Sequence, residues 1–259
     1  MKFIRIEQPT RGGSFNFSRK IYHMIGLVIP IALYVELFDF LAPWFQFPTR
    51  SAGLLALIAF TITLLLVDAL RFKVKAVNRL FVSIVGPLLK QEELKRYNAT
   101  IPYFAACLIL FIFSSTEVVM LSCIFLMIGD PVAAYTGGFY GRVRFWNNKS
   151  LEGMGAFIVA GFLGSLIFLA IHSYVDLTGN SSFHMTLADG ALNWRMLLTV
   201  FCGVFCASLA EFFSSIRLHG LWDDNFIVPL CGAIGMSVTG QYLFQLPASA
   251  LYFDPSLLF

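Results

Sequence analysis

The stretch IGDPVAAYTGGFYGR, residues 128–142, places a carboxylate, three closely spaced glycines and an arginine at the end of an apolar run. Glycines let the backbone approach phosphate oxygens, and free N–H groups there can bind an anion to which a nearby arginine adds charge. Mg2+ prefers one or two carboxylates together with phosphate oxygens and water. These residue types predict binding of a nucleoside triphosphate with Mg2+. The candidates are Asp130, Gly137, Gly138, Gly141 and Arg142.

Other positions extend this candidate site. Lys149 follows Asp130 within twenty residues, and Asp223 or Asp224 could supply a second carboxylate from another helix. The Walker pattern G-x-x-x-x-G-K-[ST] is absent. Glycines also let membrane helices pack closely, so the glycine cluster by itself is compatible with a purely structural role.

The composition is that of an integral membrane protein. Of 259 residues, 58% are hydrophobic, 13% are charged and 28 are phenylalanine, which is too apolar for the surface of a soluble domain. The five cysteines lie in apolar runs without C-x-x-C pairs, so we interpret them as small buried hydrophobic residues. No small-residue cleavage site follows the first apolar run, and we therefore expect no cleaved signal peptide.

Hydropathy predicts a single all-α membrane domain, a polytopic bundle of about seven transmembrane helices. A helix needs roughly 17 to 25 mostly apolar residues to cross a bilayer. The region 100–135 is the least defined, because the short segment 114–116 leaves only a tight turn between two spans. The expected spans are residues 22–41, 51–70, 100–116, 117–135, 153–174, 194–213 and 226–247.

The distribution of basic residues predicts a cytoplasmic N-terminus. With seven spans, sixteen Lys and Arg residues fall on one side, whereas only Arg50 and Arg195 fall on the other. The cytoplasmic segments would be a basic arm (residues 1–20), a basic loop (71–99) lying against anionic head groups, and a Gly-rich, Lys-containing nucleotide-binding loop (136–152). The membrane would be a bacterial inner membrane or one of the endoplasmic-reticulum type.

Reactive side chains gather at this cytoplasmic boundary. Carboxylates within or at the edge of a membrane are costly and usually functional, so the soluble reactant should come from the cytosol. The residues concerned, beside those of the glycine-rich stretch, are Arg19, Lys20, His23, Lys149, Glu152, Glu211, Asp223, Asp224 and Asn225.

The string GDPVAAYTGGFYGR followed by KSLEG resembles a signature of the CTP-dependent polyprenol kinase family, which includes dolichol kinase, phytol kinase and the yeast-type diacylglycerol kinase. An early R-K-x-x-H element, a later Glu and a D-N-x-x-x-P element of that family are also matched. The matching residues are Arg19, Lys20, His23, Glu211, Asp224, Asn225 and Pro229. The resemblance spans nearly the whole chain and implies a CTP- and Mg2+-dependent lipid kinase.

The resemblance implies roles for individual residues. Asp130 and one of Asp223 or Asp224 would hold Mg2+ on the CTP phosphates, and Asn225 would orient a ligand or the base. The base itself could be Asp224, Glu211 or His23. Glu152 belongs to the matched K-[ST]-x-E-G element. The CTP-binding group would comprise Gly129, Gly137, Gly138, Gly141, Arg142, Lys149, Arg19 and Lys20.

The acceptor would be a lipid alcohol of the polyprenol, phytol or diacylglycerol type that enters from the bilayer. We expect no nucleic-acid partner, and small residues in the fifth span leave a homo-oligomer open. One alternative is a phosphatidate cytidylyltransferase, a related CTP-consuming enzyme whose long C-terminal aspartate signature is absent here. A transporter is disfavoured, because transporters tend to place ionisable residues near the bilayer midplane in matching halves.

Overall fold

The computed structural model describes residues 4–6, 24–86, 97–145, 147–175, 183–187, 190–214 and 223–259. In this part of the chain the structure is almost entirely helical, and five helical stretches are long and apolar enough to cross a membrane. The prediction of an all-α membrane protein is therefore confirmed. The five stretches are α3 (Pro48–Lys73), α6 to α7 (Thr116–Tyr140), α8 (Leu151–Val175), α9 (Trp194–Phe213) and α10 with η7 (Asp224–Leu243).

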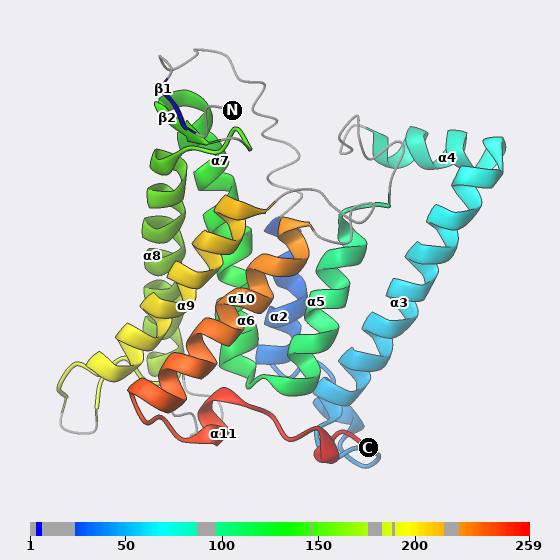
Figure 1. Ribbon diagram of the computed structural model, residues 1–259. Coiled ribbons are helices and arrows are strands. Elements are labelled where there is room, and N and C mark those ends of the chain that lie inside the picture. The colour runs from blue at the N-terminus through cyan, green and yellow to red at the C-terminus, as the bar shows by residue number, and fades with distance from the viewer. Residues whose placement is uncertain are drawn as a thin grey trace.

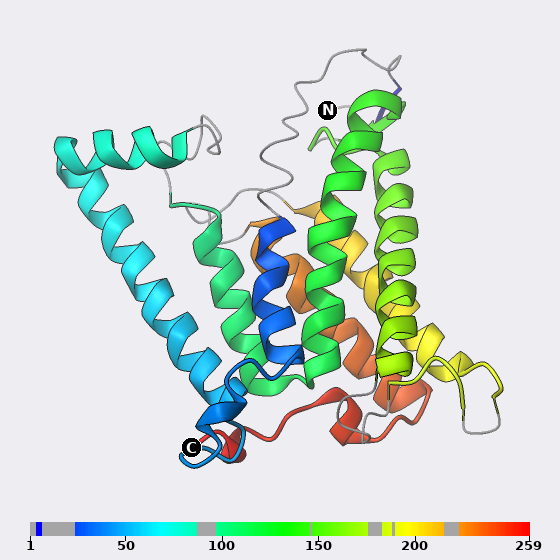
Figure 2. The same cartoon turned by 180° about the vertical axis from the view of Figure 1, so that it is seen from behind.

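Two shorter apolar helices lie where the first and third spans were expected. They are η1 with α2 (Ile25–Leu27 and Val28–Tyr34) and α5 (Thr100–Phe113). Both lie alongside the longer helices in the two opposite views of the bundle (Figures 1 and 2). They are shorter than a full bilayer crossing requires, so the count of seven spans stays a prediction.

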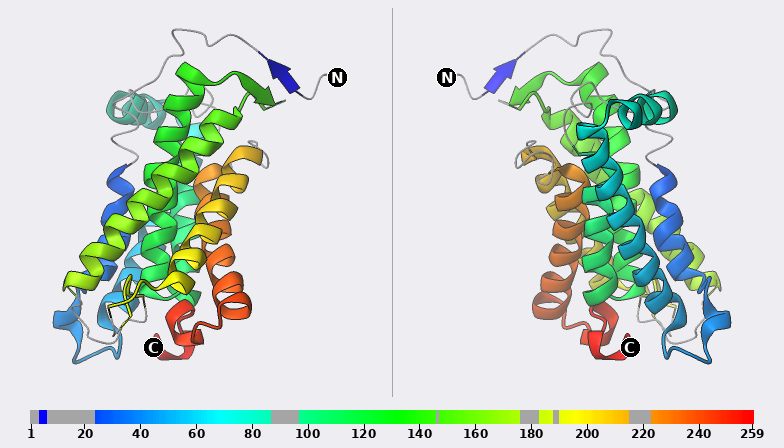
Figure 3. Two further views of the ribbon diagram at one scale, coloured as in Figure 1. Left: turned by 90° about the vertical axis from the view of Figure 1, so that its left-hand side faces the viewer. Right: turned by 90° about the vertical axis from the view of Figure 1, so that its right-hand side faces the viewer.

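The two chain ends lie at opposite ends of the bundle (Figure 1). At one end, β1 (Ile4–Ile6) pairs antiparallel with β2 (Val143–Phe145); we call this the β end. At the other end, the C-terminal segment runs across the helices and contains α11 (Ala248–Leu251) and η8 (Pro255–Leu257). Figure 3 shows both ends from the side. Opposite ends for the two termini are what an odd number of crossings requires.

A buried arginine fastens the C-terminal segment to the bundle. Arg50, in the first turn of α3, donates hydrogen bonds to the carbonyl oxygens of Phe111 at 2.6 Å and Ser114 at 2.8 Å. Its guanidinium also lies 4.1 Å from the centre of the Phe253 ring. Because the last carbonyls of a helix have no partner within the helix, Arg50 both caps α5 and holds the tail.

The stretch Thr116–Tyr140 forms the centre of the bundle. It comprises α6 (Thr116–Ile124), the π-helical turn η5 (Phe125–Gly129) and α7 (Asp130–Tyr140). Phe125 is fully buried, and a β-carbon at Gly232 of α10 would lie 2.7 Å from its ring. Gly161 of α8 also lies against Phe125, and a β-carbon there would lie 2.6 Å from Val204 of α9. Small residues on the neighbouring helices therefore let them approach the central helix closely.

One helix departs from the bundle direction. After α3 ends at Lys73, α4 (Lys75–Val85) turns across the β end of the molecule (Figures 1 and 2). The segment 71–99, expected as a basic loop, thus contains an amphipathic helix.

Candidate active site

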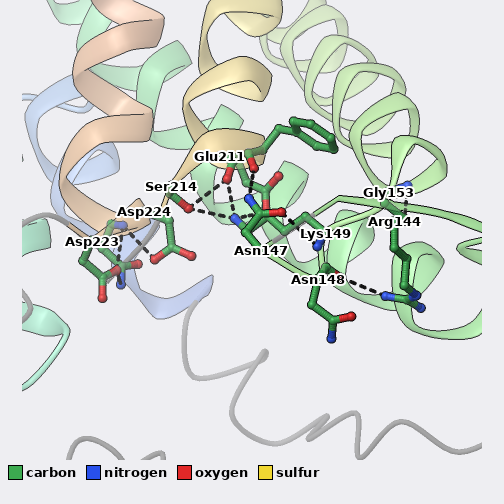
Figure 4. A network of polar contacts seen from close by, with 12 residues as sticks. Arg144, Asn147, Asn148, Lys149, Gly153, Glu211, Ser214, Asp223 and Asp224 are labelled. Atoms are coloured by element: carbon green, nitrogen blue, oxygen red, sulfur yellow. Dashed lines mark hydrogen bonds and ion pairs between the residues drawn. The ribbon is translucent and has the colours of Figure 1, made fainter. Parts of the chain in front are cut away.

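Lys149 and Glu211 form an ion pair at the β end of the bundle. The Lys149 ammonium donates to Glu211 Oε1 at 2.6 Å, to Ser214 Oγ at 2.8 Å, and to the Glu211 carbonyl oxygen (Figure 4). Glu211 is only 7% exposed. The last carbonyls of α9 have no partner within the helix and carry partial negative charge. The ammonium group therefore both supplies a hydrogen-bond donor to a carbonyl oxygen and offsets that negative charge. Two residues 62 positions apart, both predicted site residues, are brought into contact.

Further carboxylates approach this pair. Asp130 is the first residue of α7 and Asp224 the first of α10, and both lie close enough to Glu211 to interact with it electrostatically. Figure 4 shows Asp223 and Asp224 beside Ser214. Two further carboxylates thus lie within electrostatic range of Glu211, and the four charged side chains come from four separate parts of the chain.

The start of α10 is rigidly built. Buried Asp223 caps the helix: its Oδ1 accepts hydrogen bonds from the Asn225 backbone N–H at 3.1 Å and from the Asn225 side chain at 2.8 Å. Aspartate is a preferred N-cap because its oxygen satisfies an N–H that has no helical partner. Asp223 and Asn225 thereby fix the first turn, which carries Asp224.

A π-helical turn directly precedes Asp130. Pro131 has no N–H, so the carbonyl of Met127 lacks its α-helical donor, and a regular helix would be interrupted here. The wider turn η5 (Phe125–Gly129) accommodates this interruption without ending the helix. Such π turns are frequent at functional sites, and this one sets the direction in which Asp130 leaves the helix axis.

The segment that carries Lys149 is docked onto the end of α9. The Asn147 side chain donates to the Phe212 carbonyl, and its oxygen accepts from the Lys149 backbone N–H at 3.2 Å. The Phe145 ring packs edge-on against Phe212 with centroids 4.8 Å apart. Asn147 and Ser214 were not predicted from the sequence, because their contacts join the segment around Lys149 to the end of α9, far away along the chain, and no spacing pattern indicates such a contact.

At three of the four glycines predicted to bind phosphate, neighbouring atoms leave no room for a side chain. A β-carbon at Gly129 would lie 2.8 Å from the Phe157 ring, one at Gly137 would lie 2.9 Å from Ser150 Oγ, and one at Gly141 would lie 2.4 Å from a backbone oxygen. At Gly138, by contrast, a β-carbon would meet nothing within 4 Å. Gly137 and Gly138 fall in the last turns of α7 and not in a loop. Their contact with CTP stays a prediction.

The remaining predicted residues brace the turn between α7 and α8. Ser150 Oγ accepts from the Gly153 N–H at 3.1 Å at the start of α8, and the Glu152 carboxylate accepts from the Val143 N–H at 3.3 Å. Arg142 interacts electrostatically with Glu152. Arg19, Lys20 and His23 lie outside the described residues.

The donor set suits a magnesium ion shared with a substrate. Within the described ranges, no group of three or more His, Cys, Asp or Glu side chains is arranged to hold a metal. Mg2+, however, commonly takes only one or two protein carboxylates and completes its shell with phosphate oxygens and water. Asp130 and Asp224 fit this pattern.

The architecture and the site define the class: an all-α membrane protein with a carboxylate–lysine cluster at one end of its bundle. The chain is 30% identical over 224 residues to the CTP-dependent diacylglycerol kinase 1 of Eremothecium gossypii, an alignment that covers 84% of this chain and 65% of the relative. It is 28% identical to the protein of the same name from Saccharomyces cerevisiae, covering 86% of this chain and 72% of the relative. The Schizosaccharomyces pombe protein is also 28% identical, over 64% of this chain and 71% of the relative.

Over most of its length the chain is thus similar to proteins named CTP-dependent diacylglycerol kinase 1. No family model matches it, and no solved structure does. It spans just under two thirds of the length of the Eremothecium gossypii protein.

Proposed function

We propose that this protein is a CTP-dependent lipid kinase that transfers the γ-phosphate of CTP to the hydroxyl of diacylglycerol. The observation that carries the proposal is the meeting of Asp130, Lys149, Glu211 and Asp224 at one end of the bundle, in a chain similar to proteins of that name. Diacylglycerol is chosen over polyprenols and phytol because it is the substrate that the relatives' names give.

Phosphoryl transfer asks a protein mainly to align donor and acceptor and to offset charge on the transferring group. Asp130 and Asp224 would hold Mg2+, which neutralises phosphate charge when bound. Lys149 adds a positive charge whose position is fixed by three hydrogen-bond acceptors. Gly138, with open space beside its α-carbon, offers the backbone approach that a triphosphate needs.

The base among the described residues would be Glu211 or Asp224, and Asp130 with Asp223 would hold Mg2+ if Asp224 takes the hydroxyl proton. Glu211 accepts a hydrogen bond from the Lys149 ammonium, and Asp224 accepts one from the Asn225 N–H. Asp224 lies at the end of a helix, where a lipid hydroxyl at the membrane surface could reach it. The β end would face the cytosol, since most basic residues of the chain belong to segments on that side.

A transfer assay tests the function. Purified protein would be incubated with Mg2+, diacylglycerol, a polyprenol, phytol or phosphatidic acid, and CTP labelled at either the α or the γ phosphate. γ label in diacylglycerol is the expected result, lost with a chelator and restored by added Mg2+. α label that requires phosphatidic acid would instead indicate a cytidylyltransferase, and no transfer from either label would favour the transporter alternative.

A further inference from the structure

Helix α4 carries an exposed apolar stripe. Ala76, Leu80 and Ile84 recur every four residues and so lie on one face of the helix, whereas Lys75 and Arg79 lie on another. Leu80 is 63% exposed and Ile84 is 69% exposed. Large apolar side chains aligned in this way mark a surface that contacts another apolar phase.

The orientation of α4 is fixed by a buried ion pair at the end of α3. The guanidinium of Arg71 lies 2.5 Å from Asp68 Oδ1 and 4.4 Å from the centre of the Phe81 ring, on the inner side of α4. Asp68 Oδ2 accepts a hydrogen bond from the Asn98 backbone N–H at 2.7 Å, which ties the same point to the start of α5. The stripe is therefore held outward and is not free to rotate into the bundle.

The stripe continues a surface that faces lipid. On α3, a helix long enough to cross the membrane, Leu66 is 59% exposed and Leu70 is 51% exposed. Only Val74 separates α3 from α4, and α4 runs across the end of α3 instead of extending away from it (Figures 1 and 2). The exposed face of α4 thus begins at the level where the lipid-facing surface of α3 ends.

We propose that α4 lies in the plane of the membrane surface and binds an anionic leaflet. Ala76, Leu80 and Ile84 enter the boundary between head groups and acyl chains, and Lys75 and Arg79 contact lipid phosphates or carboxylates. Apolar contact plus attraction to anionic lipids is how amphipathic helices bind membrane surfaces. This role is independent of the kinase activity, because none of its residues belongs to the candidate active site.

Probe placement in proteoliposomes tests the proposal. Leu80→Cys and Lys75→Cys variants of the full chain would each be labelled with a nitrobenzoxadiazole dye, and the signal of the equally treated parent protein would be subtracted. Position 75 is exposed and lies about 140° around the helix from position 80. The vesicles would contain phosphatidylcholine with or without a minority of phosphatidylserine. In the phosphatidylserine vesicles, the probe at 80 should be quenched by lipid-borne nitroxide and be several-fold less sensitive to aqueous iodide than the probe at 75.

A charge variant tests the lipid preference. Lys75→Gln with Arg79→Gln should reduce the nitroxide quenching at 80 in the phosphatidylserine vesicles and leave it unchanged in phosphatidylcholine alone. Equal iodide access at 80 and 75 would overturn the proposal. Shielding at 80 without nitroxide quenching would also overturn it, because protein and not lipid would then cover the stripe. An unchanged melting temperature of each variant would show that the fold is retained.

Discussion

Replacing Lys149 with methionine should destabilise the protein and abolish transfer. The substitution keeps a long apolar side chain but removes the ammonium group that donates hydrogen bonds to Glu211 and Ser214. Glu211 would then remain buried, without its counter-charge and with Asp130 and Asp224 nearby. The end of α9 would also lose the donor to its carbonyl oxygen.

The expected loss follows from the burial of the pair. Removing one partner of a fully buried ion pair costs about 3–5 kcal/mol. The Lys149 side chain is 25% exposed and that of Glu211 is 9% exposed, so water screens part of the interaction. We therefore expect a decrease of about 2–3 kcal/mol in the free energy of unfolding. Unfolding in mixed micelles with increasing denaturing detergent measures this quantity.

The double variant Lys149→Met, Glu211→Met separates stability from function. It removes both charges together, so it should be more stable than the sum of the two single variants predicts, by about 1–2 kcal/mol. It should nevertheless stay inactive, because the positive charge at the site is still missing. Lys73→Met, at an exposed lysine at the end of α3, is the control and should change stability by no more than about 0.5 kcal/mol. An unaltered stability of Lys149→Met, or recovered transfer in the double variant, would refute this reasoning.

Four further predictions concern other residues. Gly141→Ala should lower stability by about 1–3 kcal/mol, because its β-carbon would lie 2.4 Å from the Gly137 carbonyl oxygen. Gly138→Ala, placed in open space in the last turn of α7, should instead raise stability by up to about 1 kcal/mol. It should also weaken CTP use, and a raised KM for CTP would show it. Asp130→Asn should abolish transfer at an unchanged melting temperature, and near wild-type turnover would contradict its metal role. Arg50→Met should cost about 2–4 kcal/mol and leave the turnover of the folded protein intact, because Arg50 lies at the end opposite the site; reduced turnover would contradict that separation.

Hydropathy located the long helices well because a membrane crossing leaves a strong compositional signal. The turn expected at residues 114–116 is confirmed: α5 ends at Phe113 and Ser115 caps α6 by accepting a hydrogen bond from the Val118 N–H. The expected span 117–135 continues, however, to Tyr140. A proline interrupts the hydrogen bonding of a regular helix, and here the π turn, which depends on the surrounding packing, lets the helix proceed past Pro131.

The charged residues of the candidate site could be predicted from the sequence, whereas the residues that position them could not. Asp130, Glu211 and Asp224 were predicted because carboxylates at the edge of apolar runs are costly and therefore conspicuous, whereas Lys149 was predicted from its place in the K-[ST]-x-E-G element. Asn147 is an ordinary polar loop residue in the sequence, and only the docking of its segment onto α9 makes it significant. The packing role of the glycines was not predictable from the sequence either, because it depends on the close approach of α7 and α8 in the folded structure.

The site is assembled where helices are interrupted, and this has a physical reason. Glu211 lies at the end of α9, Asp224 at the start of α10 and Asp130 after a π turn, and each of these places leaves backbone groups without regular helical partners. The Lys149 ammonium donates a hydrogen bond to one of these carbonyl groups, and the Asp223 carboxylate accepts one from one of these N–H groups. What remains is an excess of carboxylate over ammonium charge, which would repel a free triphosphate. The same excess favours a triphosphate that arrives with a divalent cation, so the charges of these site side chains argue for Mg2+ in the proposed reaction.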